Sequence, residues 1–137
     1  MLCMALLLCC LSGCVSVLEP ETSATDAPVV SLDRETSFFD DFAISGEKVV
    51  ITCIVWLENT GGTTQSVSLC GHFDEDRALG LVVEAVLYGS FATDGSETTF
   101  TVPPGRHQYT VYFCGTCGGN MQKADRLLPE IDVVLMK

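Results

Sequence analysis

Positive charge is scarce in this chain. Of its 137 residues, 7 are Lys or Arg and 18 are Asp or Glu, so the formal net charge is −11. Nucleic acids and anionic lipid surfaces are bound by clustered basic side chains. Here the basic residues are scattered, at Arg34, Lys48, Arg77, Arg106, Lys123, Arg126 and Lys137. The composition therefore predicts no nucleic-acid partner, and any attachment to a membrane needs a contribution other than charge.

Familiar catalytic motifs are missing as well. The sequence has no Gly-x-Ser-x-Gly elbow, no phosphate-binding glycine loop and no His-Glu-x-x-His pattern, and its only histidines are His72 and His107. The acidic cluster Asp74-Glu75-Asp76 lacks the longer alternating ligand pattern of a calcium loop, so we interpret it as a solvated loop. We expect no catalytic residue, no resident metal ion and no cofactor, and hence a protein that is not an enzyme.

The N-terminus carries the most informative motif. Leu11-Ser12-Gly13-Cys14 follows an apolar run and resembles the lipobox of bacterial lipoprotein signal peptides. In that family the cysteine receives a diacylglycerol thioether and becomes the mature N-terminus. The resemblance implies a signal peptide over 1–13, lipidation (with palmitate-type chains) of Cys14, and a location on the extracytoplasmic face of the cell membrane.

Two features leave alternatives open for this N-terminal run. It contains no positive side chain at its start, which a signal peptide normally has. Ser12, Gly13 and Ser16 interrupt it, so it falls short of the roughly 20 apolar residues that a spanning helix needs. A cleaved signal peptide without lipid, or an apolar first element of the fold, would also give this pattern.

The next segment, 14–37, is acidic and rich in Ser, Thr and Pro. Such a composition buries too little apolar surface to order itself. We therefore predict a lipidated N-terminus followed by a flexible tether, with Val29–Leu32 as a first short strand. The remaining residues, 38–137, are enough for one domain with one core.

This domain shows short β-branched or alternating runs separated by turn residues, which is typical of strands. Lys48–Leu57 is apolar on both alternating faces, so it is expected at the centre of a sheet with Trp56 in the core. The further expected strands are Thr64–Phe73, Leu81–Tyr88, Thr98–Val102, Tyr109–Cys114 and Glu130–Met136. The third expected strand, Leu81–Tyr88, also fits a helical stripe. The pattern predicts an all-β, antiparallel, immunoglobulin-like β-sandwich of about six or seven strands, with a small barrel as the second architecture.

Three segments carry a second resemblance. Phe100–Gly105, Val111–Phe113 and Lys123–Ile131 resemble a region of small uncharacterised β-rich proteins of Gram-positive anaerobic bacteria. The resemblance implies no function and supports only the domain boundary and the β-rich fold. Within Lys123–Ile131 we expect a packed corner in which Arg126 pairs with Asp125.

Four cysteines follow Cys14, and they are the candidate disulfide or metal residues together with His72. Cys53, Cys70, Cys114 and Cys117 allow three disulfide pairings, and a Cys53–Cys114 bridge would join facing sheets as in immunoglobulin domains. Cys114-Gly115-Thr116-Cys117 is a Cys-x-x-Cys motif. With Cys70 and His72 it could bind zinc, alone it could form a redox pair, and all four thiols could also stay free.

The sequence thus predicts a membrane-anchored lipoprotein whose β-domain is a non-catalytic interaction or accessory module. Its partners are expected to be the membrane, through the lipid anchor, and an unidentified extracellular protein or glycan. Two alternatives remain. One is a glycan- or solute-binding surface protein with an exposed aromatic platform, and the other is a thiol- or zinc-dependent protein that uses Cys114 and Cys117.

Overall fold

The computed structural model describes residues 28–120 and 126–136. The described residues form eight strands and one short helix: β2 (Val30–Leu32), β3 (Phe38–Ser45), β4 (Lys48–Asn59), β5 (Gln65–His72), α3 (Asp74–Ala78), β6 (Val86–Ser90), β7 (Phe100–Val102), β8 (Gly105–Thr116) and β9 (Glu130–Leu135). Every pair of neighbouring strands is antiparallel. The prediction of an antiparallel all-β sandwich is confirmed, with eight strands where about six or seven were expected.

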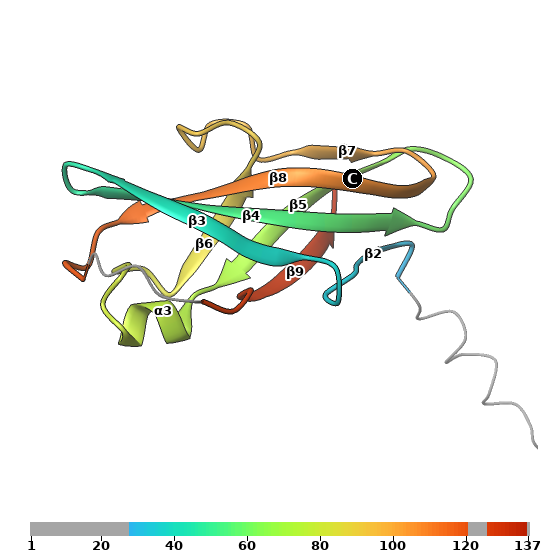
Figure 1. The fold of residues 1–137 in the computed structure, drawn as a ribbon. Coiled ribbons are helices and arrows are strands. Elements are labelled where there is room, and N and C mark those ends of the chain that lie inside the picture. The colour runs from blue at the N-terminus through green and yellow to red at the C-terminus, as the bar shows by residue number, and fades with distance from the viewer. Residues whose placement is uncertain (1–27, 121–125, 137) are drawn as a thin grey trace, which may run out of the picture.

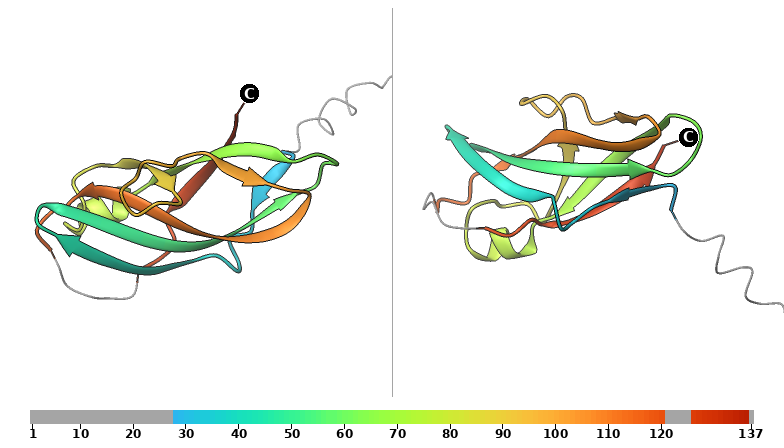
Figure 2. Two further views of the ribbon diagram at one scale, coloured as in Figure 1. Left: turned by 90° about the horizontal axis from the view of Figure 1, so that it is seen from above. Right: turned by 45° about the vertical axis from the view of Figure 1, so that its right-hand side comes forward.

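The strands make two layers (Figures 1 and 2). In the first layer β2 and β3 pair with successive parts of β4, and β4 pairs along its whole length with β8. In the second layer β9 pairs with one edge of β5, while β6 and β7 pair with the other edge. The layers therefore form a nearly closed barrel, which remains open between β2 and β9.

The strand β6 belongs to both layers and joins them. Its first half pairs with β5, and Gly89 and Ser90 then pair with Phe113 and Tyr112 of β8. This crossing needs close contact, because a Cβ atom at Gly89 would lie 2.6 Å from Cγ1 of Val111. Glycine at this position allows β6 to pass from one sheet to the other.

The core lies between the layers and follows the two-residue period of the strands. On β4, Val49, Ile51, Cys53, Val55 and Leu57 are fully buried. In the same layer β8 adds Val111 and Phe113, and the facing layer and the connections add further buried side chains, among them Val67, Leu69, Phe73, Leu81 and Phe100. The two sets form one hydrophobic cluster, as expected for a single domain.

Several local expectations differ from the structure. The strand β3 was not predicted, and Leu81–Tyr88 contributes a strand only from Val86 onward. The folded domain also includes residues 28–37, because β2 pairs with β4 within the segment that the composition assigns to the tether. Within the described ranges, no helix is long and apolar enough to cross a membrane.

Candidate functional site

Cys14 lies outside the described residues, and Cys53 lies in the core. Cys53 is opposite Val111 on the adjacent strand β8 and is fully buried. Burial raises the pKa of its thiol to about 12, with smaller contributions from the carboxylates of Asp76 and Asp40. A thiol with such a high pKa stays neutral and acts as a small apolar group.

A bridge between Cys53 and Cys114, one of the alternatives that the sequence left open, is not present in the structure. Both residues lie in the same layer, where Cys53 pairs with Val111 and Cys114 pairs with Val50. Cys53 points into the core. On β8 the residue before Cys114, Phe113, is also buried, so Cys114 points outward, and the two thiols lie on opposite faces of the layer. All four described cysteines are free thiols in the structure.

The two cysteines of the Cys-x-x-Cys motif have different surroundings. The Cys114 thiol donates a hydrogen bond to the Thr93 carbonyl oxygen at 3.2 Å, and burial together with the Asp94 carboxylate raises its pKa, against an opposing effect of Lys48. Cys117 packs instead against the hydrophobic core cluster. The residues described after β8, 117–120, are not helical. This stretch therefore lacks the helix N-terminus that lowers the thiol pKa in thioredoxin-like sites.

Cys70 and His72 lie on the outer face of β5. Nε2 of His72 is 2.8 Å from Oδ2 of Asp132 on β9, and Cys70 lies opposite Asp132 and Tyr88 in the sheet. Across residues 28–120 and 126–136, no group of three or more His, Cys, Asp or Glu side chains is placed to hold a metal ion. The structure thus pairs His72 with a carboxylate and does not bring Cys70 and His72 together with Cys114 and Cys117.

The acidic cluster that the sequence assigned to a solvated loop begins the helix α3, and one member is buried. Asp76 Oδ1 forms an ion pair with Arg126 at 2.9 Å, and the two side chains are only 8% and 5% exposed. The Arg126 guanidinium also lies 5.4 Å from the centre of the Phe42 ring. The ionic partner recorded for Arg126 is therefore Asp76, which is 50 residues away, whereas the expected partner Asp125 lies outside the described residues.

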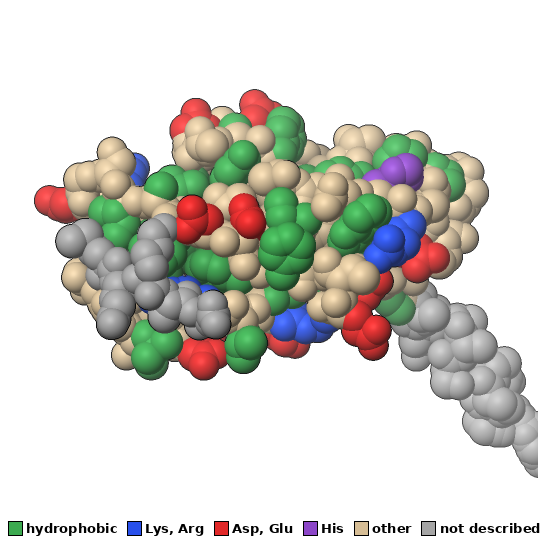
Figure 3. All heavy atoms as spheres, in the orientation of Figure 1, with side chains coloured by type: hydrophobic (Ala, Val, Ile, Leu, Met, Phe, Trp, Pro, Cys, Tyr) green, Lys and Arg blue, Asp and Glu red, His purple; other side chains and the backbone are tan. Residues whose placement is uncertain are grey.

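Trp56, which was expected in the core, lies on the outer face of β4. Its neighbours Val55 and Leu57 are buried, so the two-residue period directs Trp56 outward. The Arg106 guanidinium lies 4.2 Å from the centre of the indole ring and forms an ion pair with Asp33 at 2.9 Å. Figure 3 shows hydrophobic side chains exposed over the middle of this face, with acidic and basic side chains beside them.

The domain also carries an aromatic pocket that sequence analysis did not identify. It has a volume of about 360 Å³ and is lined by Phe91, Thr99, Phe100, Thr101 and Tyr109. The Phe100 ring meets the rings of Phe91 and Tyr109 edge to face, with centroid distances of 5.8 and 5.9 Å. Such geometry is favourable for aromatic pairs and fixes the three rings relative to one another.

Hydrogen bonds hold both sides of this pocket in place. The buried Ser90 hydroxyl accepts hydrogen bonds from the backbone amides of Ala92 and Glu97, which closes the connection from β6 to β7 beside Phe91. The Tyr109 hydroxyl donates to the Thr101 carbonyl oxygen at 2.7 Å, and burial raises the pKa of the Tyr109 phenol. The pocket is therefore built from the sheet and from a tightly closed loop.

The sequence offered only a partial signal for this pocket. Tyr109 and Phe100 lie in the expected strands Tyr109–Cys114 and Thr98–Val102, but Phe91 lies in a separate segment, and its contact with Phe100 depends on the path of residues 91–99. No family model, curated protein or solved structure matches the chain.

Proposed function

We propose that this protein is an extracytoplasmic lipoprotein, anchored to the cell membrane through Cys14, whose β-sandwich is a non-catalytic interaction module. The anchor rests on the likeness of Leu11–Cys14 to a lipobox. The observation that carries the interaction role is the aromatic pocket of about 360 Å³ lined by Phe91, Phe100 and Tyr109. Its volume lies at the lower end of the range of ligand sites, roughly 300–1,000 Å³, which are mostly apolar with a few polar groups.

The position of the pocket supports presentation to a partner. The connection that precedes β7 lies away from the point where the chain enters β2 (Figure 1), whereas the end of β7 is near that point, because Asn59 pairs with Val30 and donates a hydrogen bond to the Val102 carbonyl oxygen. An anchor attached before β2 would therefore leave the connection beside the pocket open to a partner. The Phe91 side chain is 52% exposed, so it is available to contact an apolar side chain of a partner protein, as aromatic anchors do in interfaces.

The anchor is tested by replacing Cys14 with alanine in the native host. We expect the wild-type chain to carry a diacylglyceryl group on Cys14 and to remain with membranes, because two acyl chains give stable attachment. The Cys14→Ala variant should lose the added mass and leave the membrane fraction, whereas the matched variant Cys9→Ala should retain both. A chain without added lipid mass would contradict the lipoprotein assignment.

The pocket is tested by replacing Phe91 with alanine. Cross-linking at the cell surface should recover less partner with Phe91→Ala, because this substitution truncates an exposed aromatic anchor. The control Tyr88→Ala removes a side chain of similar size and exposure that does not line the pocket, and it should leave the recovery unchanged. Equal recovery with both variants would show that the pocket does not contribute to binding.

One observation favours a glycan as an alternative ligand for the same pocket. Thr99 and Thr101 lie beside the aromatic rings, so their hydroxyl groups could bind sugar hydroxyls while a ring packs against the apolar face of the sugar. Screening of the purified chain on a glycan array, with the Phe91→Ala variant as the control, separates this ligand from a protein. Binding to a defined glycan that is lost in the variant would support the alternative.

A further inference from the structure

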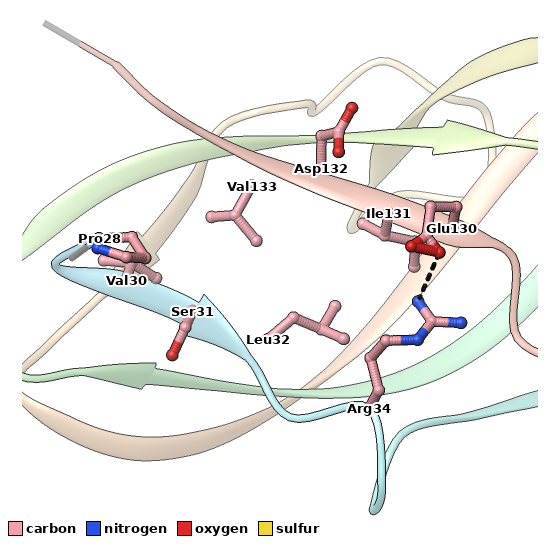
Figure 4. Close-up of a pocket in the computed structure, with 9 residues that line it drawn as sticks. All are labelled: Pro28, Val30, Ser31, Leu32, Arg34, Glu130, Ile131, Asp132 and Val133. Carbon is pink, nitrogen blue, oxygen red and sulfur yellow. Dashed lines mark ion pairs between the residues drawn. The ribbon is translucent and has the colours of Figure 1, made fainter. Parts of the chain in front are cut away.

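The opening of the barrel between β2 and β9, which we call the seam, is another concave feature of the described residues. A cavity of about 250 Å³ lies in it, lined by Val30–Leu32 on one side and Glu130–Val133 on the other, together with Pro28 and Arg34. Figure 4 shows the side chains of Leu32 and Val133 between the two strands. Arg34 connects the strands, with an ion pair to Glu130 at 3.7 Å and a hydrogen bond to the Pro129 carbonyl oxygen at 3.0 Å.

The hydrogen-bond pattern of β9 shows which backbone groups face the seam. The Met136 amide donates to the Ser66 carbonyl oxygen, in register with the pairs Val67–Leu135 to His72–Glu130. Hydrogen-bonded pairs alternate in an antiparallel ladder, so Val134, Asp132 and Glu130 direct their amides and carbonyls to β5. The backbone groups of Ile131, Val133 and Leu135 therefore point into the seam.

The same argument applies to β2. Thr60 donates to Val29 and Asp33 donates to Trp56 through their backbone groups, so the odd-numbered residues of this segment bond to β4. The backbone groups of Val30 and Leu32 then point toward β9. Within the described residues β2 pairs only with β4, and β9 only with β5. The two strands come within 8 Å of each other, between Cα atoms, at some positions, and they diverge away from the Arg34–Glu130 contact (Figure 4). Their facing edges form no ladder with each other, and such an edge accepts another strand where the two strands diverge.

The side chains of β9 define the chemistry of a strand that would bind there. Glu130 and Asp132 have side chains that are 69% and 62% exposed on the outer face, whereas Ile131 and Val133 pack against the core. A strand next to β9 would place alternate side chains beside these carboxylates and beside these apolar groups. A second copy of the chain would place like charges together and also bears the net charge of −11, so self-pairing is disfavoured.

We infer that the seam edge of β9 is a docking site for an extended segment of a partner protein in which basic and apolar residues alternate. The partner's backbone pairs with Ile131, Val133 and Leu135, its basic side chains lie beside Glu130 and Asp132, and its apolar side chains fill the cavity beside Leu32. This is strand addition, in which main-chain hydrogen bonds supply affinity and alternate side chains supply specificity. The site is separate from the aromatic pocket.

The experiment uses the full chain and a blocked peptide of alternating valine and lysine, about six residues long, as an ordinary strand is. A peptide of the same composition, with all lysines before all valines, controls for charge and apolarity, and a valine–glutamate peptide controls for the sign of the charge. Fluorescence anisotropy gives the affinity, and hydrogen exchange of individual amides locates the contact. We expect binding of the alternating valine–lysine peptide alone, with slowed exchange at the Ile131 and Val133 amides.

Two variants test the geometry. Val133→Pro removes an amide that faces the seam and leaves the ladder to β5 intact, because proline is tolerated where an edge amide is unpaired. It should weaken peptide binding by about threefold to tenfold, the effect of one lost hydrogen bond, with an unchanged circular dichroism spectrum. Asp132→Asn keeps the contact to His72 but removes a charge, and should weaken binding by about twofold to fivefold.

The matched control Glu97→Gln removes the same charge from an exposed residue of the β6–β7 connection and should leave the affinity unchanged. Equal binding of the alternating and block peptides, or full binding by Val133→Pro, would overturn the inference. Slow exchange at Ile131 and Val133 in the free chain would overturn it too, because the edge would then already be occupied by the chain itself or by a second copy.

Discussion

The buried ion pair between Asp76 and Arg126 allows a quantitative test of what holds the domain together. The two groups are 2.9 Å apart and almost fully buried. Removal of one partner from a buried ion pair leaves the other charge in a poorly solvated site without that partner, which typically costs about 3–5 kcal/mol. Since a domain of this size has a total stability of about 5–15 kcal/mol, we expect Asp76→Leu to be strongly destabilised, with Tm lowered by roughly 12 °C or more.

The double variant Asp76→Leu/Arg126→Met gives the sharper measurement. Replacement of both charges by apolar groups of similar volume is often neutral or stabilising, so the double variant should unfold near the wild-type midpoint although each single variant is impaired. Guanidinium unfolding followed by circular dichroism gives the free energies for the cycle. A matched control is available in the ion pair of Asp33 and Arg106, which has the same 2.9 Å distance but is more than a third exposed. Asp33→Asn should leave the unfolding midpoint almost unchanged, because exposed pairs contribute little.

Two results would refute this reasoning. If Asp76→Leu unfolds within about 1 kcal/mol of the wild type, the burial of the pair does not carry the expected energy. If the double variant is destabilised by the sum of the single effects, the two charges are not energetically coupled.

Three further predictions concern stability and reactivity. The pKa of the Cys53 thiol is about 12 in the folded protein and near 9.0 in an exposed thiol, so the unfolded chain loses this proton at a lower pH than the folded chain. The stability that is present below pH 9 should therefore fall as the pH rises from about 9 to 12. Urea unfolding at several pH values should show a weaker fall for Cys53→Ala, and rapid alkylation of Cys53 in the native protein would contradict its burial. Gly89→Ala should destabilise by about 1–3 kcal/mol because of the contact with Val111, measured by thermal unfolding, whereas Gly62→Ala, which meets nothing within 4 Å, should be tolerated. Ser90→Ala should cost about 1–2 kcal/mol, since it removes the acceptor of two backbone amides, and proteolysis should then cut residues 91–99 faster than in the wild type.

Sequence periodicity predicted the regular strands well because burial follows the period of the backbone. In β4 every second residue from Val49 to Asn59 is buried, and the same alternation holds over residues 67–71 of β5 and residues 111–113 of β8; the buried residues are mostly apolar. The strand β3 escaped prediction because its register shifts between Phe39 and Asp41, which breaks the two-residue period, and because only Phe42 is buried along it. A pattern that changes phase within a strand cannot be recognised from alternation alone.

The position of Trp56 shows a second limit. Both faces of β4 are apolar in sequence, which predicted burial on both sides. In the structure only the side chains on the face with Val55 and Leu57 are fully buried, and those on the other face are partly exposed. The sequence does not reveal whether another layer covers the outer face. The aromatic pocket and the seam were missed for a related reason: each forms between segments far apart in the chain, and local patterns do not specify their contact.

The late position of β9 has a consequence for how the chain acquires its fold. This last strand pairs with β5 over six residues, and Arg34 bonds to the carbonyl oxygens of Leu128 and Pro129, more than 90 residues away. The second sheet is therefore incomplete until the C-terminal residues are present. Folding must then wait until residues 130–135 have been made, and a barrier dominated by such distant contacts makes it slow.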